Sequence, residues 1–205
     1  MLKRLAPFAL LLVLPACGGH KSTATVVSTT SQTAPATTGA AAAAPPGALK
    51  AEANSAAAGD IPDNQVFIEF ADAQAGYTIK YPEGWAQQGG AGNVTIRDKN
   101  NIVRIVVRAS KKPTAATVRS DVSQLGGATV QGAPQALTIG GKPAFKAVYT
   151  TQSAPNAVTG KRVTLTVDRY YVWNGGKEAI VDLGTPVGVD NVDAYRLMIE
   201  SFKWK

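Results

Sequence analysis

Residues able to do chemistry are few in this chain of 205 residues. It holds one cysteine, Cys17, and one histidine, His20, both close to the N-terminus. A single cysteine excludes an internal disulfide, CxxC redox chemistry and a multi-cysteine zinc site. Because residues 61–205 lack histidine, they cannot form a Ser-His-Asp or Cys-His arrangement or a histidine-containing zinc site. The commonest hydrolase chemistries are therefore excluded from this part of the chain.

The sequence before Cys17 points to export. Lys3 and Arg4 precede a ten-residue apolar run, residues 5–14, and the small Ala16 adjoins the cysteine. This order of regions is typical of a secretory signal peptide. The run is too short to span a bilayer, which needs about 20 apolar residues. We therefore expect residues 1–16 to be removed.

The four residues Leu-Pro-Ala-Cys at 14–17 resemble the bacterial lipobox, which directs diacylglycerol onto the thiol of an invariant cysteine. The resemblance implies that Cys17 begins a mature bacterial lipoprotein and carries a lipid anchor. Two or more acyl chains hold a protein durably to a membrane. The expected location is extracytoplasmic, on the cell membrane or, in a host with two membranes, on the outer one. The alternative is an ordinary secreted protein.

Residues 17–60 have the composition of a tether. Ala, Thr, Ser, Pro and Gly dominate this segment, and large apolar residues are almost absent. Such a composition cannot bury enough surface to offset the entropy of ordering, so we expect a disordered linker. As a flexible coil it would span on the order of 35 Å. The alternative is a short Ala-rich helix over residues 47–58, which would be marginal in isolation.

Residues 61–205 are predicted to form one globular domain of the α+β class. Period-two apolar patterns predict short strands over residues 66–70, 77–81, 94–97 and 103–108. Gly-Gly pairs at 140–141 and 175–176 predict two hairpin turns between longer strands. Helical spacing follows Thr114, the expected cap of one helix, and recurs in residues 190–202, where Asp190 is the expected cap. We therefore expect an antiparallel β-sheet of six or seven strands covered by helices.

Four segments of the domain resemble the PsbP-like family. Residues 76–85, Gly-Tyr-Thr-Ile-Lys-Tyr-Pro-Glu-Gly-Trp, are similar to its opening strand and turn. Residues 137–144 resemble its Gly-x-Pro-Ala hairpin, residues 169–172 fall on its next long strand, and residues 198–202 resemble the end of its last helix. The resemblance implies a Mog1/PsbP α/β/α sandwich.

The family resemblance also carries expectations about function. Its members act as binding or accessory subunits rather than enzymes, so no catalytic residues and no cofactor are expected. Some photosystem members bind metal through histidines and carboxylates, but His20 lies in the tether, so that role does not transfer. A long Ala/Thr-rich tether before a basic domain resembles the envelope lipoproteins of actinobacterial type more than a photosynthetic subunit.

Two features of the domain are candidates for a ligand or partner surface. Removing Lys3 and Arg4 leaves 19 basic and 14 acidic residues, a surplus of five. Basic clusters attract anionic headgroups and acidic polymers, whereas the alternative is a solvated sheet face. Strand alternation puts Tyr171 and Trp173 on one face and Tyr170 on the other. Such aromatic side chains could stack on a sugar or lipid, or simply pack the core. The candidate residues are Arg104, Arg108, Lys111, Lys112, Tyr171 and Trp173.

The expected function is that of a non-enzymatic binding or accessory module of the cell envelope. Its partners would be the membrane, through Cys17, and an unknown envelope protein, lipid or glycan, and not nucleic acid. The alternative is a carboxylate-dependent envelope hydrolase or transferase, and a third reading is a passive spacer. A carboxylate cluster in a deep pocket would favour the enzyme. The carboxylates considered for such a cluster are Asp60, Asp63, Asp182, Asp190 and Asp193.

Overall fold

A computed structural model describes residues 54, 58–156 and 158–205. The predicted signal peptide, Cys17 and most of the predicted tether lie outside the described residues. No helix in the described ranges is both long and apolar enough to cross a membrane. The described domain is mainly antiparallel β-sheet with two helices, which confirms the predicted α+β class.

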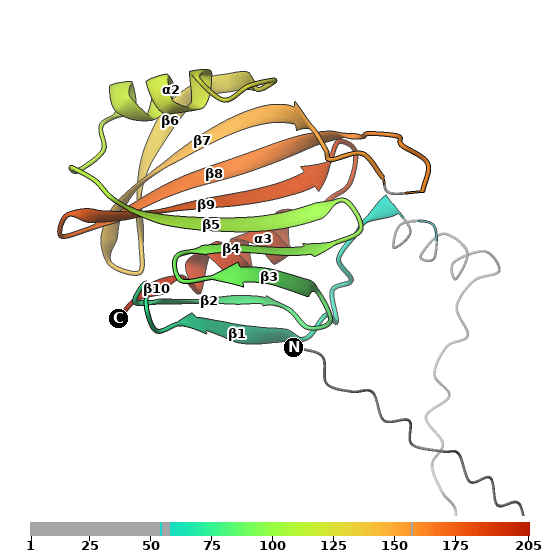
Figure 1. Ribbon diagram of the computed structural model, residues 1–205, viewed down its shortest axis with the longest axis horizontal. Helices are drawn as coiled ribbons and strands as arrows, with labels where there is room; N and C mark the ends of the chain where they lie inside the picture. The colour runs from blue at the N-terminus through green and yellow to red at the C-terminus, as the bar shows by residue number, and fades with distance from the viewer. Residues whose placement is uncertain (1–53, 55–57, 157) are drawn as a thin grey trace, which may run out of the picture. The chain divides into compact units, whose positions relative to one another are not determined.

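Seven antiparallel strands form the larger sheet, which agrees with the predicted number (Figure 1). Consecutive strands pair as hairpins, except that β5 pairs with β9 and β6 lies at the opposite edge of the sheet. Both Gly-Gly turns lie where they were predicted, between β6 and β7 and between β8 and β9. In sheet order the strands are β3 (Ala86–Gly90), β4 (Asn93–Asp98), β5 (Asn101–Ala109), β9 (Lys177–Pro186), β8 (Thr164–Asn174), β7 (Lys142–Gln152) and β6 (Thr129–Ile139).

A second, three-stranded sheet was not predicted. It consists of β1 (Phe67–Asp72), β2 (Tyr77–Pro82) and the short β10 (Lys203–Trp204), with β2 in the middle. The first two strands were expected, but as part of a single sheet. A turn in which the Trp85 amide donates to the Pro82 carbonyl, with Gly84 at φ +88°, separates β2 from β3. Glycine adopts this conformation without a Cβ penalty.

The first of the two sheet-covering helices is α2 (Ala115–Ser123). Thr114 is its N-cap, as predicted, and its hydroxyl accepts from the Thr117 amide at 3.2 Å. Thr117 Oγ1 in turn accepts from the Thr114 amide at 2.8 Å. This reciprocal arrangement satisfies two amides at the start of the helix. Val118 and Val122, four residues apart, face the sheet and are buried.

The other helix, α3 (Val192–Glu200), begins one residue later than predicted. Asn191 is its N-cap residue, rather than the expected Asp190, and makes no side-chain cap bond. The Asn191 side chain instead donates to the Gly59 carbonyl and to Thr185 Oγ1, and it accepts from the Ile61 amide. This buried amide therefore holds the start of the domain, Gly59 to Ile61, against the end of β9.

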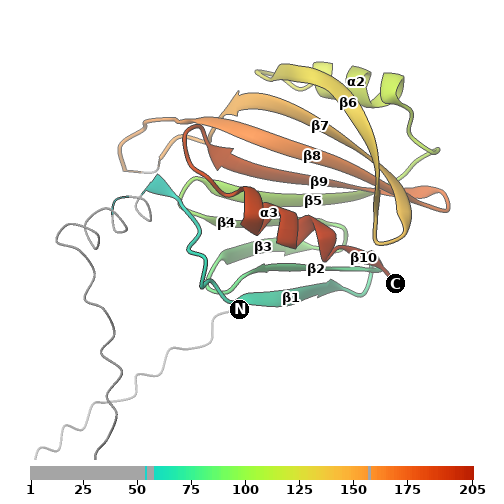
Figure 2. The ribbon, with the colours of Figure 1, turned by 180° about the vertical axis from the view of Figure 1, so that it is seen from behind.

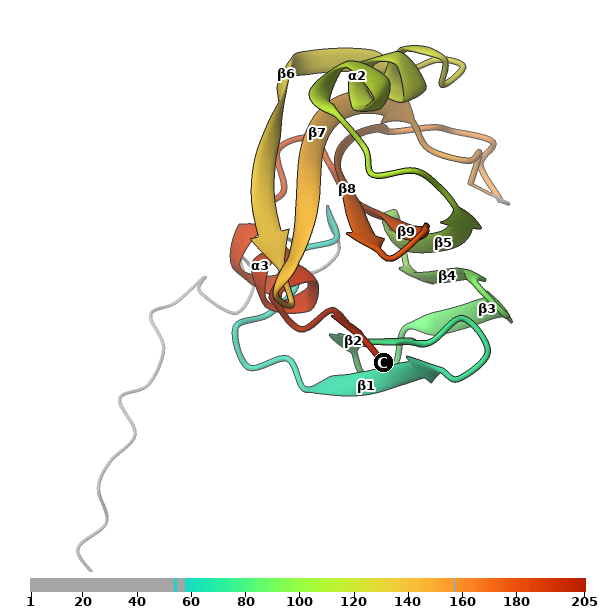
Figure 3. The same cartoon turned by 90° about the vertical axis from the view of Figure 1, so that its left-hand side faces the viewer.

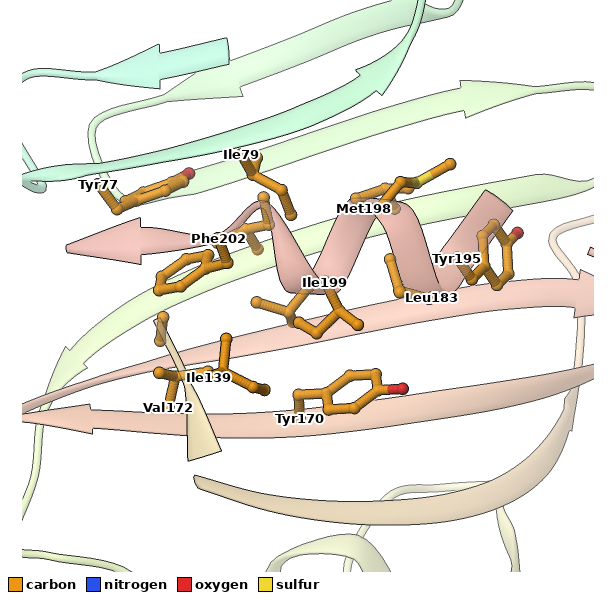
Figure 4. Close-up of a cluster of buried hydrophobic side chains, with 14 of the residues drawn as sticks. Tyr77, Ile79, Ile139, Tyr170, Val172, Leu183, Tyr195, Met198, Ile199 and Phe202 are labelled. Carbon is orange, nitrogen blue, oxygen red and sulfur yellow. The ribbon is translucent and has the colours of Figure 1, made fainter. Parts of the chain in front are cut away.

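The two helices lie on opposite faces of the larger sheet (Figures 2 and 3). On the α3 face, the larger hydrophobic cluster joins the sheet to α3 and to the small sheet. Figure 4 shows side chains of this cluster, including Tyr170 from β8 and Ile199 from α3. On the α2 face, a smaller cluster packs α2 against β7, β8 and β9. Strand alternation places Tyr170 on the first face and Tyr171 on the second, as predicted.

Candidate functional site

The most spacious of three pockets among the described residues lies between α3 and the sheet, with a volume of about 610 Å³. Its lining comes from β6, β7, β8 and β9, from the segment joining β9 to α3, and from α3 itself. Small-molecule sites in proteins are typically clefts of roughly 300–1,000 Å³ with mainly apolar walls. The apolar residues that line this cavity are Leu137, Ile139, Tyr170, Leu183, Pro186, Val187, Val189, Val192, Tyr195 and Ile199.

Two periodicities place the inner wall of this cavity. On β9 and β8, alternation turns Leu183 and Tyr170 to the α3 face of the sheet. On α3, Tyr195 and Ile199 are four residues apart and therefore share one face of the helix. The Tyr195 hydroxyl donates to the Gly184 carbonyl at 2.6 Å. This hydrogen bond holds the Tyr195 ring in one position between α3 and β9. Figure 4 shows these side chains between the helix and the strands.

Exposed valines flank the cavity where the chain passes from β9 to α3. Val187 is 60% exposed and Val192 is 71% exposed, and both are among its lining residues. Single exposed apolar residues are ordinary on protein surfaces. Here, however, they continue an apolar wall out to solvent. An apolar chain entering the cavity would therefore contact hydrocarbon from the surface inward.

The charged residues of the cavity wall balance one another. Lys146 Nζ lies 2.6 Å from Asp168 Oδ2, and it stands 5.6 Å from the centroid of the Tyr170 ring. The Tyr170 hydroxyl donates to Asp168 at 3.4 Å. Burial raises the pKa of Tyr170, so the phenol stays protonated and able to donate. With Arg196 and Glu200, the lining has two cations and two anions and no net charge.

A second pocket, of about 380 Å³, collects carboxylates where the domain begins. Asp60, Asp63, Asp190 and Asp193 line it together, so four of the five carboxylates considered from sequence share one place. The fifth, Asp182, is buried on the α2 face of the larger sheet. Asp193 is paired with Arg196 at 2.8 Å. Among the described residues, no group of three or more His, Cys, Asp or Glu could hold a metal ion.

A third pocket, of about 300 Å³, lies between α2 and the sheet. It brings together four of the six residues singled out as a candidate surface: Arg108, Lys111, Lys112 and Tyr171. The other two are nearby in the fold but do not line it. Arg104 is exposed on β5 and Trp173 donates its indole N–H to the Ser110 carbonyl at 3.2 Å.

Ion pairs connect several of the side chains that line this third pocket. Glu178, only 2% exposed, accepts from Arg108 Nε at 2.7 Å. Asp121 of α2 accepts from the Tyr171 hydroxyl at 2.5 Å and from Arg108 Nη2 at 3.3 Å. Burial raises the pKa of Tyr171, which keeps this phenol a donor. The carboxylates of this pocket are thus engaged with protein donors.

A buried ion pair extends the network under α2. Arg169 Nη1 donates to Asp182 at 3.3 Å, and both residues are 6% exposed. Arg169 Nη2 also lies 3.7 Å from Asp121. Burial raises the pKa of Asp182 even though Arg169 and Arg104 act to lower it. Neighbouring strands place these charges, because Arg104 is directly opposite Asp182, and Asp182 is directly opposite Arg169.

The residues of the large cavity were not identified from the sequence. Lys146, Asp168 and Val192 belong to separate segments, and only the pairing of β7 with β8 and the docking of α3 bring them together. One local signal did exist. Residues 186–189, Pro-Val-Gly-Val, place two valines beside a proline and a glycine at the end of β9 and the start of the connecting segment, where polar residues are usual. Such apolar residues outside a strand or helix indicate a surface that covers or contacts something.

No family model matches the chain, and no curated protein matches it. The structure is similar to the solution structure of cyanobacterial PsbP (CyanoP) from Synechocystis sp. PCC 6803, with 19% sequence identity, a TM-score of 0.49, and coverage of 72% of this chain and 98% of that one. It is also similar to the Ran-binding protein Mog1p of Saccharomyces cerevisiae, with 10% identity, a TM-score of 0.45, and coverage of 69% and 96%. A third similar structure is LpqN, involved in cell envelope biogenesis of Mycobacterium tuberculosis, with 14% identity, a TM-score of 0.41, and coverage of 69% and 91%.

Proposed function

We propose that this protein is an extracytoplasmic binding module, anchored through Cys17 and not an enzyme, that holds an amphiphile by its apolar chain. The observation that carries the proposal is the cavity of about 610 Å³ between α3 and the larger sheet. Each methylene moved from water into such a cavity contributes about 0.8 kcal/mol. A chain of about ten carbons could thus gain several kcal/mol after the ordering costs of binding.

The charges of the cavity wall favour a head group without net charge. Lys146 and Asp168 neutralise each other on the sheet side, and Arg196 and Glu200 stand on the helix side. A net anionic head would gain from the two cations but would also meet two carboxylates. An uncharged or zwitterionic head can pair with both signs and with the threonine hydroxyls of Thr166 and Thr185.

The proposed anchor and the cavity are connected at Asn191. Its side chain holds the Gly59 carbonyl at 3.1 Å, and the same residue lines the cavity. The segment that leads back toward Cys17 therefore leaves the domain beside the proposed ligand site. A module held in this way would be supplied with amphiphiles by the membrane to which it is attached.

Titration with single-chain detergents tests this function. The chain is used with Cys17→Ala so that no lipid of its own competes, and dodecyl maltoside, dodecylphosphocholine and dodecyl sulfate are added below their micelle concentrations. Isothermal titration calorimetry measures stoichiometry and affinity. We expect one saturable site that prefers the uncharged and zwitterionic detergents. Absence of saturable binding by all three would refute the proposal.

Two surface substitutions locate the binding. Val192→Glu places a charge beside the cavity and removes an apolar contact worth about 1.5 kcal/mol, so the affinity should fall about tenfold. Val158→Glu makes the same change at a position that is 93% exposed and lines none of the three pockets described above. It should leave the affinity unchanged. Equal losses in both variants would show that the detergent binds elsewhere.

A change of wall charge tests the preference for the head group. Asp168→Asn keeps the shape of the side chain but leaves Lys146 without its ionic partner, so the lining gains one positive charge. The ratio of the dodecyl sulfate to the dodecyl maltoside affinity should rise by severalfold. An unchanged ratio would show that the head group does not lie against β8.

A further inference from the structure

We propose that the pocket between α2 and the sheet is a second binding site, independent of the amphiphile cavity, that takes a phosphate group. Arg108 of β5 and the two consecutive lysines Lys111 and Lys112 line this pocket of about 300 Å³. Three cations from one short stretch of chain thus line the same pocket.

The loop that carries the lysines is held in place from both sides. The Ser110 amide donates to the Gly176 carbonyl at 2.9 Å, and the Ser110 carbonyl accepts from the Trp173 indole at 3.2 Å. Both partners belong to the β8–β9 hairpin. On the other side of the loop, the capping box of Thr114 and Thr117 fixes the start of α2. The backbone on both sides of the lysines is therefore anchored before any ligand arrives.

The carboxylates of the pocket do not neutralise the lysines. Glu178 and Asp121 accept from Arg108, and Asp121 also accepts from the Tyr171 hydroxyl. Lys111 and Lys112 form no ion pair within the part of the chain that the structure describes. Three cations against two carboxylates leave the lining with one positive charge. The uncompensated charge belongs to the lysine ammonium groups at the edge of the pocket.

Phosphate is the anion that suits this lining. A lysine ammonium group is a compact point charge that pairs readily with phosphate. The pocket is also lined by Ser120, whose hydroxyl accepts from Gln124 Nε2 at 3.2 Å and keeps its own proton for a phosphate oxygen. Few apolar side chains line it, so it offers little to an acyl chain. The phosphate could belong to a lipid head group or to a soluble molecule.

The two sites would not obstruct each other. Glu178, at one end of β9, lines the phosphate pocket on the α2 face, whereas Leu183 and Pro186, toward the other end of β9, line the cavity on the α3 face. The larger sheet separates them. The domain could therefore hold an amphiphile while contacting a phosphate-bearing surface or polymer.

The test compares two double variants of the Cys17→Ala chain. Lys111→Gln with Lys112→Gln removes the proposed ligands of the phosphate. Lys161→Gln with Lys203→Gln removes the same charge at two exposed lysines that line none of the three pockets. The probes are vesicles of phosphatidylcholine containing phosphatidylglycerol, followed by sedimentation, and inorganic phosphate, followed by amide chemical shifts over residues 110–121.

We expect the Lys111/Lys112 variant to lose vesicle affinity by about 25-fold, because each lysine near an anionic surface contributes roughly fivefold. The control variant should bind like the parent. Binding of vesicles alone identifies a lipid head group as the source of the phosphate, and shifts with inorganic phosphate as well identify a site for the isolated group. Equal losses in both variants, or no binding of either probe by the parent chain, would overturn the proposal.

Discussion

The two faces of the larger sheet bury different kinds of side chains. On the α3 face, apolar side chains of both sheets and of α3 form one continuous cluster that leaves a large apolar cavity beside it. On the α2 face, a smaller apolar cluster lies next to the buried charges Arg169, Asp182 and Glu178. The comparison indicates that stability comes mainly from the first face. The second face depends on charges that must remain paired.

The largest expected loss of stability comes from a substitution in the apolar cluster on the α3 face. Phe202 is fully buried, with its ring centroid 5.5 Å from that of Tyr77 and 5.6 Å from that of Trp204. Phe202→Ala should lower the free energy of unfolding by about 3–5 kcal/mol. The counterpart on the α2 face, Val122→Ala, should cost about 2 kcal/mol. Urea denaturation measures both, and equal losses would contradict the assigned division between the faces.

A somewhat smaller loss of stability is expected from a substitution in the buried ion pair on the α2 face. Arg169→Met leaves Asp182 buried without its ionic partner, which should cost about 3 kcal/mol in the same urea experiment. Replacing both residues, Arg169→Met with Asp182→Leu, removes the uncompensated charge. The double variant should therefore recover most of the loss. A double variant as unstable as the single one would show that packing, and not charge pairing, sets the cost.

The smallest expected effect is a dependence of stability on pH, which arises from a buried carboxylate on the α2 face. The pKa of Asp182 is raised in the folded protein because burial penalises its charged form. Its contribution to stability is therefore fully present below the unfolded pKa of about 4 and is lost as the pH rises through the folded value. The stability of the parent chain relative to Asp182→Asn should fall over this range, by at most about 1.4 kcal/mol per pH unit.

Thermal or urea unfolding of both proteins at a series of pH values measures this difference. A stability difference between the parent and Asp182→Asn that rises with pH would contradict the assigned sign.

Much of the fold could be predicted because the relevant signals are local. Alternation along β8 put Tyr170 and Tyr171 on opposite faces, Gly-Gly pairs marked two hairpins, and Thr114 marked the start of α2. The misses have physical causes. β3, Ala-Gln-Gln-Gly-Gly, has a weak strand propensity and forms because β4 offers it a free edge. Asn191, and not Asp190, is the N-cap residue of α3, because tertiary contacts hold the Asn191 side chain.

The candidate sites also differ in how far local sequence patterns could identify their residues. The lysines of the phosphate pocket could be found from sequence, since Lys111 and Lys112 are consecutive and Arg108 is close by. The carboxylates that neutralise Arg108 come from α2 and β9, and no local pattern connects them. The amphiphile cavity has even less local signal. Its ion pair, Lys146 with Asp168, exists only because β7 and β8 pair in one register.

The sequence by itself determined which residue types this domain lacks and most of the elements from which it is built. A missing domain histidine and a single cysteine near the N-terminus are facts of composition, and strand alternation and helix caps depend on neighbours only a few residues away. Only the tertiary structure decided which residues meet. Insertion of β9 between β5 and β8 aligned the buried charges on one face, and docking of α3 across the other face left the cavity open. Those arrangements depend on contacts between residues far apart in the chain, which local patterns do not encode.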